Sequence, residues 1–283
     1  MPKKIVLNIK TALLGGLLLA LWVPLQAQSP RSVARKFTKE IQQTHKTILI
    51  QEPASLYKFN LKYQNSGKYA HLNKEQMDSI SLANSEYIKN IPDSIFLHYF
   101  SIGYVDELKK FGFLPFIGKM PVPSNKPDYY ADIAQAELEE QYYPYTDTAY
   151  LDNKAYVFKK NLNALDVSFW FKVYPSEVKD AKSQRVLFAE NLLVDDINGQ
   201  FSMDNKGTLV YFYKITKLSL SKIYQYAAGL GSTYADYTYD HLLNDYLKKE
   251  LSASKLEGKY WHYSPEFKKF YTGDEYRFVE LNQ

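Results

Sequence analysis

The chain has 283 residues, of which 46% are hydrophobic and 23% charged, with 26 tyrosines and no cysteine. This composition indicates a globular protein with a sizeable core, and it excludes thiol catalysis, disulfides and cysteine-based metal sites. The formal charge of +4 falls to +1 without the three lysines of residues 1–28, a segment that holds no acidic residue. Such a balance argues against nucleic acid as a partner, because phosphate binding needs concentrated positive charge.

Residues 1–28 have the pattern of a secretory signal peptide. Three lysines lie in the first ten residues, residues 12–23 are uncharged and apolar, and LQA at 25–27 is an imperfect small-residue cleavage site. The apolar run is too short to span a bilayer. We therefore expect cleavage near residue 27 and an exported mature chain without a transmembrane span, in the periplasm or at the cell surface. An uncleaved anchor is the alternative.

The next hundred residues predict three helices and two short strands. Ser29 and Pro30 are typical of an N-cap and a first helical turn, with an apolar stripe at Val33, Ala34, Phe37 and Ile41. Residues 46–51 predict a core strand, 54–73 a loop or irregular strand, 74–90 a helix, 94–110 a second helix and 113–117 a short buried strand. We expect Gly103 to break or weaken the second helix and Gly112 to cap it in the left-handed conformation.

The stretch at 128–150, DYYADIAQAELEEQYYPYTDTAY, divides this half from a strand-rich half. Its apolar residues follow a helical period loosely, but prolines on both sides and tyrosine pairs at its ends favour a strand. Read as a strand, Tyr129, Ala131, Ile133, Gln135, Glu137 and Glu139 share one face.

The second half predicts strands and then helices. Residues 165–174 and 185–194 predict a hairpin, 195–199 (DDING) a turn, and 208–213 a strand. Residues 219–228 and 233–251 predict two helices divided by Gly229 and Gly231. In the aromatic tail at 252–283, residues 276–281 predict an edge strand.

These elements predict an α/β (α+β) fold, with a single mixed sheet and helices packed mainly on one face. We expect residues 29–283 to form one exported domain, with an irregular insertion at 54–92. The order of these elements resembles that of the small α/β domains of periplasmic accessory proteins, such as the amino-terminal domains of TolB-type and CsgG-type proteins. The segments that carry the resemblance are KTILIQEP, VDELKKFGF, KPDYYADIAQAELEE, and the hairpin LDVSFWFKVY and RVLFAENLLV. The insertion and the missing lipobox cysteine depart from that pattern. The LQAQ signal end and the lack of cysteine also resemble exported proteins of Bacteroidota-type bacteria.

The acidic candidates for catalysis are Glu137 and Glu139, beside Glu140. On one face of a strand the first two would lie about 7 Å apart, within the separation of about 5–9 Å that a glycosidase needs between its carboxylates. A solvated acidic surface is the alternative interpretation. The five histidines show no metal-ligand spacing, and DDING lacks the ligands of a calcium loop, so we predict no metal or cofactor.

The aromatic candidates for binding are Tyr142, Tyr143, Tyr145, Trp170 and Trp261. Exposed aromatic side chains bind sugars and protein partners, although packing at sheet margins is the alternative. We therefore expect a non-catalytic, exported binding or accessory protein whose partner is a protein or glycan of the cell envelope. A glycan-acting hydrolase that uses the Glu137 and Glu139 pair is one alternative, and a module that binds a small ligand or sugar is another.

Overall fold

The computed structural model describes residues 29–63, 73–118, 126–178, 185–273 and 277–281. The expected signal peptide lies outside these residues. The described chain is 37% helical and 42% strand, in one main mixed sheet with helices packed on it, as expected. None of the described helices has the length and apolar character needed to cross a membrane.

The main sheet has seven strands, in the order β11-β6-β5-β4-β1-β3, with β2 also paired to β4. Their bounds are β1 Thr47–Gln51, β2 Tyr57–Asn60, β3 Leu114–Ile117, β4 Tyr129–Leu151, β5 Lys154–Pro175, β6 Val186–Val194 and β11 Val279–Leu281. β1, β2 and β3 pair in parallel, whereas β4, β5, β6 and β11 pair antiparallel. The central stretch is therefore a strand, as predicted, and it pairs with β1, β2 and β5.

β5 begins at Lys154, earlier than the predicted 165–174, and forms a long hairpin with β4. Asp152 and Asn153 connect the two strands with φ values of 49° and 61°. A two-residue loop with both φ values positive matches the right-handed twist of the strands.

A bulge between Ile133 and Gln135 corrects the predicted faces of β4. Before the bulge Ala131 and Ile133 are buried, whereas after it Ala136, Leu138 and Glu140 are buried. The extra residue shifts the alternation by one position. Glu137 and Glu139 therefore point away from the face that carries Ile133, and Glu140 points into the protein.

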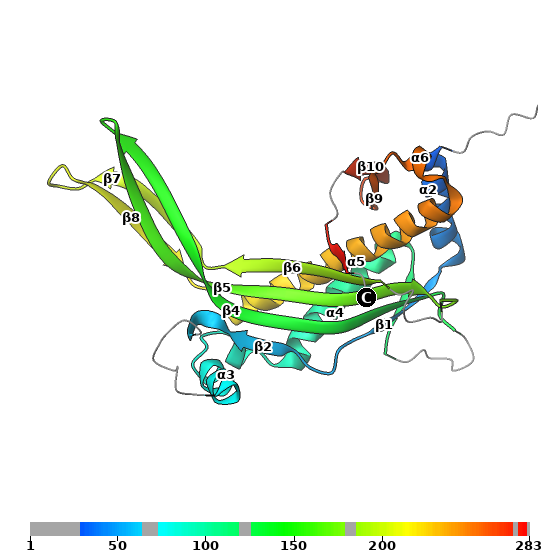
Figure 1. The fold of residues 1–283 in the computed structure, drawn as a ribbon, viewed down its shortest axis with the longest axis horizontal. Helices are drawn as coiled ribbons and strands as arrows, with labels where there is room; N and C mark the ends of the chain where they lie inside the picture. Colours follow the sequence, from blue (N-terminus) through cyan, green and yellow to red (C-terminus); the bar gives the residue numbers. More distant parts are fainter. Residues whose placement is uncertain (1–28, 64–72, 119–125, 179–184, 274–276, 282–283) are drawn as a thin grey trace, which may run out of the picture.

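The helices α2 (Pro30–Thr44), α4 (Asp93–Phe111) and α5 (Leu220–Glu250) build the core with one face of the sheet. Figure 1 shows α4 and α5 together behind the sheet, and no helix of the described chain on the face toward the viewer. Phe100 of α4 stacks on Phe169 of β5 with ring centroids 4.4 Å apart, and Tyr234 of α5 packs edge-on against the same ring. These contacts confirm that helices cover mainly one sheet face.

The prediction that glycines break the helices was wrong. α4 runs through Gly103, and α5 is one continuous helix through Gly229 and Gly231. A Cβ on Gly103 would lie 1.9 Å from the Ala228 carbonyl oxygen, and one on Gly231 would lie 2.0 Å from that of Phe100. Two of these glycines thus allow close contact between α4 and α5. Gly112 does cap α4, at a φ of 101°.

Two hairpins form an arm that projects from the body (Figure 1). One consists of the β4–β5 tip, and the other of β7 (Asp196–Met203) and β8 (Leu209–Thr216). The 195–199 turn was therefore wrong, because residues 196–199 begin β7. The hairpins pack through aromatic rings, with Phe158 stacked on Tyr211 at 4.1 Å between centroids. Gly199 makes room for this packing, since a Cβ there would lie 2.5 Å from the Tyr211 ring.

The insertion at 54–92 contributes β2, the helix α3 (Lys74–Ala83) and the short 3-10 helices η1 (Leu61–Tyr63) and η3 (Ile88–Asn90). Glu140, which is fully buried, anchors it to β4. Its carboxylate accepts hydrogen bonds from Lys62 Nζ at 2.7 Å and from the amides of Glu86, Tyr87 and Ile88 at 2.8, 2.8 and 3.2 Å. Burial alone would raise the pKa of Glu140, but these hydrogen bonds outweigh it and lower the pKa.

The tail adds the short helix α6 (Ala253–Leu256) and the hairpin of β9 (Tyr260–Ser264) and β10 (Lys269–Gly273), which packs on α5. The edge strand that the sequence predicts in the tail is β11, which covers residues 279–281 and pairs with β6. β3 is also at an edge, and its Leu114 and Ile117 are nearly half exposed, so the prediction of a buried strand there was wrong.

Candidate functional site

The first candidate region is the sheet face without a helix, which we call the open face. It is formed by outward side chains of β4, β5 and β6 that lie side by side in rows. The rows are Tyr130 with Tyr174; Asp132, Lys172 and Val186; Gln135, Trp170 and Phe188; Glu137, Ser168 and Glu190; and Glu139, Asp166 and Leu192. Successive outward residues on a strand are about 7 Å apart. The open face therefore presents two aromatic rows, separated by the row of Asp132 and Lys172, and then two acidic rows.

Four carboxylates gather at the acidic end of the open face. Two are the predicted Glu137 and Glu139, and the structure adds Asp166 and Glu190, which the sequence interpretation missed. Burial, and then Glu190, raises the pKa of Asp166 to about 7, because Asp166 is only 4% exposed. Burial and the charges of Glu137 and Glu190 raise the pKa of Glu139. One of these carboxyl groups therefore carries a proton for part of the time at neutral pH.

Aromatic pairs occupy two of the other rows of the open face. Tyr130 stacks on Tyr174 with ring centroids 5.2 Å apart, and Trp170 lies 4.8 Å from Phe188 in a tilted arrangement. As expected from strand alternation, Phe169 and Phe171 point into the core and Trp170 points outward. Each ring is partly exposed, so these pairs form a platform beside the carboxylates.

The three tyrosines of β4 that the sequence suggests for binding lie in different places. Tyr143 pairs with Leu162 on the side of the open face, whereas Tyr142 points to the opposite side, 5.1 Å from Lys62 Nζ. Tyr145 lies inside the arm, where its hydroxyl is 3.1 Å from that of Tyr211. The cluster in sequence is therefore not one aromatic platform in space.

Trp261 lies on β9, which packs on α5, on the other side of the sheet from Trp170. Its backbone exchanges two hydrogen bonds with the Asn244 side chain, at 2.9 and 2.7 Å. Trp261 therefore helps to hold the tail on α5 and does not join the open face.

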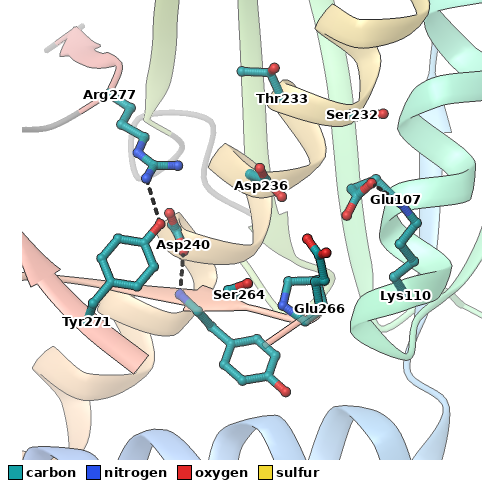
Figure 2. Close-up of a pocket in the computed structure, with 12 residues that line it drawn as sticks. Glu107, Lys110, Ser232, Thr233, Asp236, Asp240, Ser264, Glu266, Tyr271 and Arg277 are labelled. Carbon is teal, nitrogen blue, oxygen red and sulfur yellow. Dashed lines mark hydrogen bonds and ion pairs between the residues drawn. The ribbon is translucent and has the colours of Figure 1, made fainter. Parts of the chain in front are cut away.

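The second candidate region is a cavity of about 570 Å³ between α4, α5 and the β9–β10 hairpin (Figure 2). α4 contributes Glu107 and Lys110, α5 contributes Ser232, Thr233, Asp236 and Asp240, and the tail contributes Tyr263, Ser264, Pro265, Glu266, Tyr271 and Arg277. These residues are far apart in the sequence, and no local pattern marked them as a group.

Asp236 differs from the other charged groups of this cavity in its hydrogen bonding and its pKa. It is partly buried, and within the described ranges its carboxylate has no hydrogen bond or ion pair. Burial, and then the charges of Glu107 and Asp240, raises its pKa to about 7, although Arg277 and Lys110 act in the opposite direction. A carboxyl group without a partner in a cavity is a candidate for binding or proton transfer.

The neighbouring Asp240 and His262 form a closed pair. His262 Nδ1 lies 2.6 Å from the Asp240 carboxylate, which also accepts a hydrogen bond from the Tyr263 amide. The His262 ring is 3% exposed and stacks on Tyr271. In the described part of the chain no serine or threonine hydroxyl is hydrogen-bonded to this ring. The pair therefore fastens the tail to α5.

Among the described residues, no group of three or more acidic or histidine side chains is arranged to hold a metal ion. No protein-family model matches the sequence, and no curated protein is significantly similar to it. The functional assignment therefore rests on the geometry of the open face and the cavity.

Proposed function

We propose that this is an exported, non-catalytic binding protein, and that its open face holds a protein or glycan of the cell envelope. The observation that supports this is the uncovered face itself, with its two aromatic pairs beside four carboxylates. Aromatic rings supply flat apolar contact area at a low cost in conformational entropy. Carboxylates supply strong acceptors for hydroxyl or cationic donors.

The spacing of the rows favours an extended ligand. The Tyr174 and Trp170 rows are four residues apart along β5, which corresponds to about 14 Å. A polymer that lies along the strands would contact both aromatic pairs and then the carboxylates. A binding role also fits the structural use of the other ionisable candidates, because Glu140 anchors the insertion and His262 fastens the tail.

Binding is tested with Trp170→Ala and, as a matched control, Trp261→Ala. Immobilised protein is exposed to purified envelope glycans and to envelope protein extracts, and bound material is quantified. We expect Trp170→Ala to lose most of the binding and Trp261→Ala to keep it while both variants stay folded. Equal retention by both variants would remove the open face from the proposal.

Export is tested separately by the intact mass of the protein isolated from its native cells. The proposal requires an envelope species that lacks about the first 27 residues. A full-length species found in the cytoplasm would contradict it.

A glycan-acting hydrolase remains the second candidate, because a specific observation favours it. Asp166, with a pKa of about 7, lies in the row of Glu139 and beside that of Glu190. A protonated carboxyl could act as general acid while an ionised neighbour acts as base or nucleophile. Hydrolysis of envelope polysaccharides that disappears in Asp166→Asn, and in a double Glu137→Gln and Glu139→Gln variant, would establish this function. Binding without turnover by the wild-type protein would support the first proposal.

A further inference from the structure

We propose that the cavity between α4, α5 and the β9–β10 hairpin binds a small organic cation with a primary ammonium group, and that Asp236 is its counter-ion. The cavity volume of about 570 Å³ is within the range of small-molecule sites. Figure 2 shows Asp236 on α5 between Asp240 and Glu107, which reaches in from α4. The ligand would lie in this space, with the tail hairpin as the opposite wall.

The charges of the cavity favour a cation. Among the lining residues the acidic side chains of Glu107, Asp236, Asp240 and Glu266 outnumber the basic ones of Lys110 and Arg277. Neither basic group is ion-paired with Asp236, because Lys110 Nζ lies 2.6 Å from Glu107 and Arg277 donates to the Tyr271 hydroxyl at 2.6 Å. Asp236 has no such partner within the described ranges. An ammonium group placed against its carboxylate would supply the missing opposite charge.

The hydrogen-bonding groups around Asp236 have the same bias. The Thr233 hydroxyl donates to the Gly229 carbonyl at 3.1 Å, so its oxygen can still accept a hydrogen bond. One Asp240 oxygen already accepts from His262 and the other from the Tyr263 amide. The Thr233 hydroxyl and the Asp240 carboxylate therefore present acceptor oxygens beside Asp236. An ammonium ion has three donors and no acceptor, so it matches these groups.

Tyr271 is an aromatic lining residue of the same cavity. Its ring stacks on His262 with centroids 5.0 Å apart and lies 5.7 Å from the Arg277 guanidinium, so the faces of the ring already have protein neighbours. The ring edge is left to contact the carbon atoms of an organic ligand. No residue that lines the cavity belongs to the open face, so this site does not depend on the function proposed above.

The test is a calorimetric titration of the protein, residues 28–283, with 1,4-diaminobutane and with n-butylamine at pH 8. We expect saturable binding by the wild-type protein and at least tenfold weaker binding by Asp236→Asn. Asp78→Asn makes the same charge change on the exposed surface of α3 and should bind as the wild-type protein does. Thr233→Val is a second test within the site, with an expected loss of several fold.

The pH dependence separates the counter-ion role from a structural role. Between pH 8 and pH 5.5 a carboxyl with a pKa of about 7 loses most of its charge, so the affinity should fall by roughly 10- to 30-fold in the wild-type protein. Asp236→Asn should show no comparable change. No saturable binding by the folded wild-type protein, equal affinity in Asp236→Asn, or binding of inorganic phosphate in place of either amine would overturn the proposal.

Discussion

Gly231→Ala tests a close backbone contact between α4 and α5. The new Cβ would lie 2.0 Å from the Phe100 carbonyl oxygen and 2.7 Å from the Tyr104 amide nitrogen. Both are backbone atoms of α4, so no side-chain rotation relieves the overlap. Overpacking of this kind costs about 1–3 kcal/mol, and alanine returns at most ~1 kcal/mol of helix propensity. Because the overlap is with backbone, we expect a net loss of about 2 kcal/mol.

Gly229→Ala is the matched control, two residues earlier on the same helix. A Cβ there would have no atom within 4 Å, so only helix propensity changes. We expect this variant to gain up to ~1 kcal/mol. For a chain of this size a loss of about 2 kcal/mol lowers the Tm by roughly 4–8 °C. Thermal and urea melts followed by circular dichroism measure both variants. If Gly231→Ala melts at or above Gly229→Ala, α4 and α5 do not cross at this glycine.

The remaining predictions concern stability. Glu140→Gln should cost about 3–5 kcal/mol in urea melts, because it leaves the buried Lys62 without its carboxylate, whereas Glu139→Ala on the opposite face should be nearly neutral. Leu108→Asp should abolish the folded circular dichroism spectrum, because it places a charge at a fully buried position, and a wild-type melt would remove α4 from the core. Folding raises the pKa of Asp236 from 3.8 to about 7, so its carboxyl destabilises the protein increasingly from pH 4 to pH 7. Allowing for partial exposure, Asp236→Asn should therefore be about 1–3 kcal/mol more stable than wild type at pH 8 and equal to it near pH 4, and an unchanged difference across this range would contradict the assignment.

Much of the fold was predictable because its signals are local. The Ser29 side chain accepts a hydrogen bond from the Ser32 amide at the start of α2, as its place before Pro30 predicts. Gly112 adopts the left-handed conformation that ends α4. The proline and tyrosine flanks of the central stretch identified β4 correctly. Each of these features depends on a few neighbouring residues, which the sequence shows directly.

The errors arose where tertiary contacts decide. A glycine within a helical pattern can break the helix or allow another backbone to approach, and only the packing of α4 on α5 decides which. The bulge after Ile133 reversed which sheet face each of the three following glutamates lies on, because one extra residue shifts the alternation of the strand by one position. It buried Glu140 and left Glu137 and Glu139 on the open face.

The candidate sites were less predictable than the fold. Strand alternation placed Trp170 outward, and the same alternation puts Asp166 on its face, so Asp166 carried a signal that the choice of Glu137 and Glu139 overlooked. Nothing in the sequence marked Glu190, because its neighbours depend on the register with which β6 pairs with β5. The cavity unites α4, α5 and a tail hairpin, which only the tertiary fold brings together.

The chemistry of the open face also distinguishes its two possible partners. A partner that covers it must face the neighbouring carboxylates of Glu137, Glu139 and Glu190. A glycan would do this with neutral hydroxyl groups, and its ring faces would pack on Trp170. A protein would use lysine or arginine, and that attraction is screened over about 8 Å at physiological ionic strength.

Salt therefore separates the two partners. Binding of a glycan should change by less than about twofold between 50 mM and 500 mM salt, since no net charge is paired. Binding of a basic protein surface should weaken by roughly tenfold or more over this range. A steep salt dependence that Glu137→Gln and Glu190→Gln reduce would assign the open face to a protein. A flat dependence together with loss of binding in Trp170→Ala would assign it to a glycan.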